Sequence, residues 1–416
     1  MPVAAADRGY LRRANNKIKT IVHKVKYIAR PTAQLVCRTL DYDDVLIAQK
    51  QLKNHRQWID SSIESEFAKK FSQWNQSKYA FPFLSGRASL SACIFALGLM
   101  PGDEVIVPGF TCIVVPNAFD FAQVKVVYCD IELETYGLDV EEIKKHITPK
   151  TKAILLHHLF GLVCRDYMAI IELARRNNLY VIEDCAHSTG AFYKGTRVGN
   201  YGDLAFYSSE LSKIFNTIQG GVVTTNDSFL AKGLSRFYEH APYPDFERIE
   251  NQLHNVIVNY YRFKHPLRNH LGIKYELRYK DKIYDSTTEE EIMGIKPKDY
   301  GCKMPAAISL LAINQLSKID YYNRKRRQAA KRWDAWCVGM GYQKPKVVEH
   351  SAPVFLRYPI LVDEEKKRDL SWSTKNPKIT PGRWFLTNLH PVKRVVPGCP
   401  NADKAVRQCI NFPTLL

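Results

Sequence analysis

The sequence predicts an α/β fold built on a large, mostly parallel sheet with helices on both faces. Short apolar runs alternate with helical patterns through the first half of the chain, as in strand-helix units. With 416 residues, 45% of them hydrophobic and 25% charged, the chain is long enough for this large domain and a smaller one. The predicted strands of the large domain are residues 105–108, 126–130, 153–158, 179–184, 204–207 and 222–225.

Helical patterns and a glycine-containing turn open the predicted domain. Apolar residues recur at helical spacing between Asp41 and Trp74. After residues 79–84, the turn Ser85-Gly86-Arg87-Ala88-Ser89 leads into an apolar helix at 90–99. Backbone N–H groups and the helix dipole favour an anion at such a turn, so it is a candidate phosphate site.

One lysine lies on a short polar loop between two predicted strands. Lys213 precedes the pair Gly220-Gly221 on this loop, and Asp184 ends an upstream apolar run. Ligands of open parallel sheets gather at the carboxyl ends of strands. A lysine and an aspartate at one sheet edge suit pyridoxal phosphate (PLP), the amine holding the aldehyde and the carboxylate facing the ring nitrogen. Taken alone, a loop lysine is more often a solvated charge, and an acid at a strand end is more often a cap.

Five motifs occur in a fixed order along the chain. They are Ser85 to Leu90, Pro101 to Pro108, Glu183 to His187, Ser208 to Lys213, and Gly220-Gly221. With these motifs the chain resembles the DegT/DnrJ/EryC1/StrS family of PLP-dependent sugar aminotransferases. The resemblance runs from about residue 41 to 227 and resumes at about 300–320. It implies the PLP-transferase fold of type I, with a PLP-binding domain at 41–310 and a small C-terminal α/β domain at 311–416.

The resemblance implies two catalytic residues. Lys213 is expected to hold the cofactor and later to move a proton as a free amine, and Asp184 is expected to keep the ring nitrogen protonated. Lysine at this position favours transamination, because related dehydratases carry histidine there. His187 is expected to donate to the ring hydroxyl; the alternative is a capping or core histidine.

The resemblance also implies a phosphate site at Gly86, Arg87, Ala88 and Ser208, with Lys303 reaching the phosphate of a second subunit. Arg87 replaces a small hydroxyl residue, and it either adds a cation to this site or points away.

Cys112 stands where relatives often carry an aromatic residue that stacks on the cofactor ring. Phe110 or His187 would compensate for it, or the ring is held less firmly.

Two basic segments bear on the partners of the chain, whose net charge is +18. Residues 1–40 carry nine Lys or Arg against one acid and form a predicted basic amphipathic arm. The large domain has an expected insertion at about 240–299, basic and aromatic over 255–284. Both segments suit peripheral contact with an anionic membrane, and the insertion also suits a nucleotide diphosphate. Alternatively, the arm packs on its own domain or a dimer partner, and the insertion covers that partner. No motif for nucleic acid accompanies the charge.

The ten cysteines form no Cys-x-x-Cys pair, so reduced thiols and no metal site are expected. The sequence has no apolar run long enough to span a membrane and no secretory signal, so a cytoplasmic place is expected.

The sequence therefore predicts a cytoplasmic, homodimeric PLP-dependent aminotransferase. It is expected to move an amino group from glutamate to a nucleotide-linked keto-deoxysugar, in surface polysaccharide or glycoconjugate biosynthesis. The alternative is a non-catalytic relative that binds PLP or sugar as a sensor or scaffold, suggested by Arg87, Cys112 and the early end of the chain.

Overall fold

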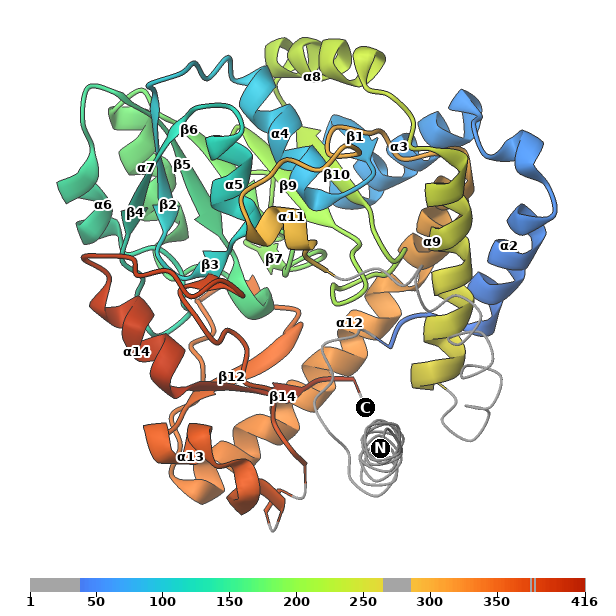
Figure 1. Cartoon of the computed structure of the whole chain (residues 1–416). Coiled ribbons are helices and arrows are strands. Elements are labelled where there is room, and N and C mark those ends of the chain that lie inside the picture. Colours follow the sequence, from blue (N-terminus) through green and yellow to red (C-terminus); the bar gives the residue numbers. More distant parts are fainter. Residues whose placement is uncertain (1–37, 265–285, 375, 378, 416) are drawn as a thin grey trace, which may run out of the picture.

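The computed structural model describes residues 38–264, 286–374, 376–377 and 379–415, and a seven-stranded sheet organises them (Figure 1). The strand order is β1-β10-β9-β6-β5-β2-β4. Strands β9, β6, β5, β2 and β4 are parallel, and β10 and β1 extend the sheet with antiparallel pairs. The predicted mixed α/β fold with a large, mostly parallel sheet is confirmed. The strands are β1 (Tyr79–Phe83), β2 (Glu104–Pro108), β4 (Lys125–Cys129), β5 (Thr151–His157), β6 (Tyr180–Asp184), β9 (Leu204–Ser208) and β10 (Gly221–Thr225).

The central strands are apolar throughout because both of their faces are buried. In β2, Ile106 belongs to a first hydrophobic cluster and Val105 and Val107 to a second, as the two-residue period of a strand requires. Helices cover both faces. The first cluster takes side chains from α2 (Tyr42–Leu52), α3 (Ser61–Asn75), α6 (Val140–His146), α7 (Tyr167–Arg176) and α9 (Phe246–Asn259). The second takes them from α4 (Gly86–Ala96), α5 (Val114–Asp120) and α8 (Ser228–His240).

The long helix α12 (Ala306–Met340) connects the sheet to a smaller C-terminal part (Figure 1). Its first turns pack in the first cluster through Leu311, and its last turns reach a third cluster through Trp333. The boundary predicted between residues 310 and 311 falls inside this helix. The smaller part contains β12 (Arg357–Leu361) paired with β14 (Cys409–Pro413), together with α13 (Glu364–Arg368), η6 (Leu370–Thr374) and α14 (Pro400–Gln408).

Short elements close the loops around the sheet. A parallel bridge between β3 and β13 brings the smaller part next to the strand ends. These elements are η1 (His55–Gln57), β3 (Thr111–Cys112), η2 (Leu159–Gly161), β7 (Phe192–Tyr193), β8 (Thr196–Arg197), η3 (Tyr260–Lys264), α11 (Glu289–Ile292), β11 (Ser351–Ala352) and β13 (Leu389–His390).

The predicted membrane segments fall mostly outside the described residues, which exclude 1–37 and 265–285. Within 255–264, residues 256–258 are buried in α9 and face the protein interior. This apolar stretch is therefore part of the core and does not offer its side chains to a membrane. No helix in the described part of the chain has the length and hydrophobicity that crossing a bilayer requires.

Candidate active site

A pocket lies where β5, β6 and β9 end, at His157, Asp184 and Ser208. The sequence argument placed a ligand site at this edge of the sheet. Predicted site residues that line the pocket are Gly86, Arg87, Cys112, Asp184, His187, Ser208 and Lys213. Ala88 and Lys303 are not among its lining residues.

The predicted phosphate turn forms the start of α4. Ser85 is the N-cap, and its Oγ accepts a hydrogen bond from Ala88 N–H at 3.1 Å. Ala88 is fully buried behind the turn, and its N–H is already used. The N–H groups of Gly86 and Arg87 precede it in the first turn, where an anion is favoured. A Cβ at Gly86 would lie 3.1 Å from Ser208 Cβ, so glycine lets the turn pack against the end of β9.

Arg87 faces the pocket, but its charge is compensated by Glu291. The two side chains form an ion pair, and Arg87 Nη2 also donates to Ser286 O at 3.3 Å. Glu291 is fully buried in α11, which belongs to the predicted insertion, and Asn117 Nδ2 donates to its carbonyl oxygen at 2.7 Å. Burial disfavours the charged guanidinium, yet the adjacent Glu291 carboxylate raises the pKa of Arg87 above its ordinary value. The insertion thus contributes a charge beside the phosphate turn.

Asp184 lies at the end of the central strand β6. Its Oδ1 accepts a hydrogen bond from Ala186 N–H at 2.9 Å, and Ala186 also lines the pocket. Burial raises the pKa of Asp184, while Ala186 N–H and the positive charge of Lys213 act in the opposite direction. A cation placed beside this carboxylate would favour its ionised form.

Lys213 and His187 meet inside the pocket, with Lys213 Nζ 3.0 Å from His187 Nε2. Phe160 N–H donates to His187 Nδ1 at 3.2 Å. Burial is the first cause of a pKa of His187 well below its ordinary value, and Lys213 and Arg357 add to the effect. The ring is therefore neutral, and its Nδ1 acts as an acceptor for Phe160 N–H. This histidine presents its Nε2 to Lys213 in the interior of the pocket.

The loop that carries Lys213 is held by hydrogen bonds within the loop and by hydrogen bonds from helix α12. Leu211 N–H donates to Ile218 O at 3.0 Å and closes the loop at its middle. Two buried side chains of α12 contact it from outside. Gln315 Oε1 accepts from Asn216 N–H at 3.1 Å, and Arg326 Nη2 donates to Ile214 O at 3.1 Å. The lysine therefore extends from a rigid support.

Cys112 lines the pocket at β3. Burial raises the pKa of its thiol above the ordinary value, so the side chain is a neutral thiol. Phe110 is fully buried and packs against Phe385, with ring centroids 5.3 Å apart, and it does not line the pocket. His187 does line the pocket, so of the two compensating residues considered from the sequence only His187 is in place.

Lys303 lies away from the pocket of its own chain. Its backbone bridges to Phe83, and its ammonium group lies 5.2 Å from the ring centre of Tyr238 and 4.7 Å from that of Tyr243. Its predicted contact with the phosphate of a second subunit stays a prediction.

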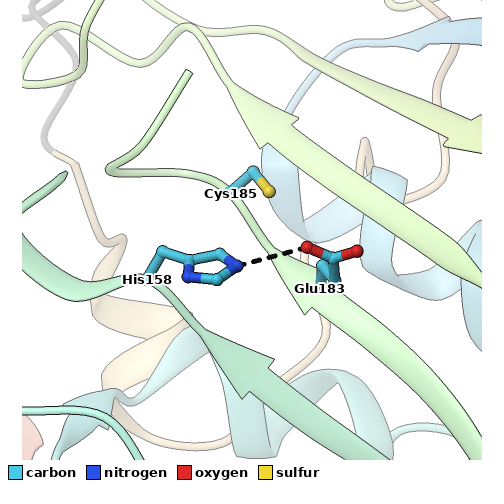
Figure 2. A group of neighbouring side chains, drawn as sticks. All are labelled: His158, Glu183 and Cys185. Atoms are coloured by element: carbon cyan, nitrogen blue, oxygen red, sulfur yellow. Dashed lines mark hydrogen bonds and ion pairs between the residues drawn. The ribbon is translucent and has the colours of Figure 1, made fainter. Parts of the chain in front are cut away.

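His158, Glu183 and Cys185 come together behind the pocket (Figure 2). His158 Nδ1 accepts from Cys164 N–H, so the ring turns its Nε2–H toward Glu183 Oε2, 3.2 Å away. Glu183 also accepts from Tyr167 Oη at 2.5 Å. Burial would raise the pKa of Glu183, but these hydrogen bonds outweigh it and lower the pKa. These hydrogen bonds anchor the end of β6 and occupy lone pairs of His158 and Glu183.

The profile of the DegT/DnrJ/EryC1/StrS aminotransferase family matches residues 43–415. The chain belongs to this family. The chain resembles GDP-perosamine synthase of Escherichia coli O157:H7, with 41% identity over 175 residues, which are 42% of this chain and 48% of that protein. It also resembles L-glutamine:2-deoxy-scyllo-inosose aminotransferase of Streptomyces kanamyceticus, with 30% identity over 68% of this chain and 58% of that protein. The chain thus spans about half the length of these curated relatives.

The solved structures similar to this chain share its fold. NtdA of Bacillus subtilis, solved with the bound cofactor PMP, has a TM-score of 0.66 and 21% identity, and the match covers 91% of this chain and 78% of that one. PLP is the cofactor of the family.

The residues present in the pocket fit PLP. An amine (Lys213), a buried carboxyl group (Asp184) and a helix N-terminus (Gly86) line one cavity, matching the aldehyde, the ring nitrogen and the phosphate of this cofactor. The space is also shaped by glycine: a Cβ at Gly221 would lie 2.5 Å from Ser85 O.

Several residues of the pocket were not identified from the sequence. Glu210, Gln219, Ser286 and Phe385 line the pocket, and Glu291 pairs with Arg87. The pattern Thr288-x-x-Glu291 is a capping box, and this signal predicts the short helix α11 but not its partner.

Proposed function

We propose that the chain is a PLP-dependent aminotransferase that transfers an amino group from glutamate to a nucleotide-linked keto-deoxysugar. The observation that carries the proposal is that Lys213, Asp184 and the Ser85-Gly86 turn line one pocket at the carboxyl edge of the sheet. A lysine in a loop or an acid at a strand end is common, but their convergence with an anion-favouring turn is what PLP chemistry requires.

Bound PLP supplies the electron sink that stabilises a carbanion at the donor Cα. In the proposed site, Lys213 holds the cofactor aldehyde and, once displaced, carries the proton away from Cα as a free amine. Asp184 keeps a proton on the ring nitrogen, because a buried carboxylate stabilises an adjacent cation. His187 donates its Nε2 proton to the ring hydroxyl. Gly86, Arg87 and Ser208 bind the phosphate.

The substrates are proposed from the relatives' names. GDP-perosamine synthase supports a nucleotide-linked sugar, and the inosose aminotransferase, named for L-glutamine, makes glutamine the competing donor. An assay of the purified protein with PLP, a panel of GDP-, UDP- and TDP-linked keto-sugars, and either donor tests the proposal. We expect an amino-sugar nucleotide by mass spectrometry, together with 2-oxoglutarate from glutamate. Binding of sugar nucleotides without amination, by protein that retains PLP, would instead favour a sensor or scaffold.

We also propose a homodimer in the cytoplasm, with peripheral membrane contact through residues 1–40 as a second possibility. Light scattering on a sizing column measures the dimer directly. Liposome flotation at low salt tests the arm: wild type floats and a variant lacking residues 1–40 stays in solution if the arm binds an anionic membrane.

A further inference from the structure

Helix α9 of the predicted insertion contacts the loop that carries Lys213. Gln252 is fully buried, and its Nε2 donates to Thr217 O at 2.7 Å and to Gln219 O at 2.5 Å. Both carbonyl groups belong to the half of the loop that follows Lys213 and leads into β10. The insertion is therefore joined to the scaffold of the candidate active site, whatever else it covers.

Arg248 lies one turn before Gln252 on α9 and contacts the side chain of Gln219. Its Nη2 donates a hydrogen bond to Gln219 Oε1, and its Nε forms an ion pair with Asp299 at 2.9 Å. Because the amide oxygen of Gln219 is engaged by Arg248, the group that this side chain has left for a ligand is its NH2, a hydrogen-bond donor.

Gln219 is close to the phosphate turn because of the register of two strands. Phe83 pairs with Gly221 at the last position of the antiparallel β1–β10 ladder. Ser85 lies two residues after Phe83, and Gln219 lies two residues before Gly221. The two segments therefore run side by side into the pocket that both residues line. Gln219 is nearly buried, at 4% exposure, which shields a hydrogen bond made there from water.

We propose that Gln219 donates a hydrogen bond to the phosphate of the cofactor and that Arg248, held by Asp299, is a positioning residue that orients it. The inference rests on the PLP site proposed above and is independent of the sugar substrate. It gives the phosphate a neutral donor in addition to Arg87, whose charge is already balanced by Glu291. It also gives the insertion a specific part in holding the cofactor.

Equilibrium binding of PLP and of pyridoxal, which lacks the phosphate, separates this contact from a general effect on the loop. Gln219→Met removes the donor at similar size, and Gln219→Glu replaces it with an acceptor. For both variants we expect the Kd for PLP to rise at least about tenfold while the Kd for pyridoxal changes less than about twofold. Arg248→Met is expected to show the same selective loss, about threefold to tenfold, and Arg248→Lys a smaller one.

Gln252→Glu is the matched control, since it disturbs the same loop without touching the phosphate turn. It is expected to weaken PLP and pyridoxal by equal factors. Equal weakening of both ligands by the Gln219 variants, or no weakening, would overturn the inference and leave the proposed function standing. If wild type binds PLP no better than Lys213→Ala does, the proposed site itself is wrong and the inference falls with it.

Discussion

Lys213 Nζ lies 3.0 Å from His187 Nε2, and the backbone N–H of Phe160 fixes the other nitrogen of the same imidazole as an acceptor. The histidine is neutral, because burial and neighbouring cations hold its pKa well below the ordinary value. The amine of Lys213 and Nε2 of the imidazole thus face one another in the pocket. Four predictions about single residues follow from this geometry and from the charges around it.

Removal of the His187 donor should slow turnover. We expect His187→Phe to lower kcat with glutamate about 100-fold, whereas His187→Gln, which keeps an N–H donor, stays within about tenfold of wild type. Stopped-flow measurement of the donor half-reaction gives both rates. Equal rates for the two variants would show that the ring fills space and donates no functional hydrogen bond.

Asp184→Asn should leave the pocket filled but disable it. The amide has nearly the same size, yet it cannot stabilise a positive charge on the ring nitrogen, so the donor half-reaction is expected to slow at least about 100-fold. Cofactor content, measured by absorbance after dialysis, should remain close to that of wild type. A variant that retains the wild-type rate would remove Asp184 from the proposed chemistry.

Glu291→Gln should destabilise the protein because it leaves the buried Arg87 guanidinium without its counter-charge. We expect a loss of about 3 kcal/mol in the free energy of unfolding. Glu290→Gln is the control on the same short helix, where the side chain is exposed, and it should change stability by less than about 0.5 kcal/mol. Urea denaturation of both variants measures whether loss of the buried carboxylate destabilises the protein more than loss of the exposed one. Matching midpoints would contradict the pairing.

His157 should make the stability depend on pH. Burial lowers its pKa to about 4, below the ordinary value of about 6.5. Between these values the unfolded chain binds a proton that the folded chain does not, so stability falls as pH decreases from about 6.5 to about 4. The full contribution is about 3 kcal/mol. His157→Gln should lower the number of protons taken up on unfolding in this pH range by about one, which reduces the slope of unfolding free energy against pH. An unchanged slope would assign the pH dependence to other groups.

The sequence predicted the sheet and the strand-end residues because these features are encoded locally. A strand is recognised from a few consecutive apolar residues; Asp184 is the last residue of one such strand, and Lys213 lies on the loop after another. The order of strands then brings the two residues together. The glycines at 86 and 221 were recognised for the same reason, since each lies inside a short motif.

Contacts between distant segments could not be predicted. Arg87 and Glu291 are 204 positions apart in the chain, and no pattern in the sequence links them. From the sequence, Arg87 could either join the phosphate site or point away; it lines the pocket, but with its charge paired to the insertion. Gln219 lies directly before the Gly220-Gly221 motif, yet an uncharged side chain between two strands gives no signal in the sequence that it lines a pocket.

The most direct test of the central claim is an absorbance spectrum of the purified protein with PLP, recorded before and after glutamate and beside Lys213→Ala. The account predicts a band near about 410 nm that moves to about 330 nm when glutamate is added, and that is missing in the variant. A protein that shows no such band, or a variant that keeps it, would contradict the assignment of Lys213 as the residue that holds the cofactor.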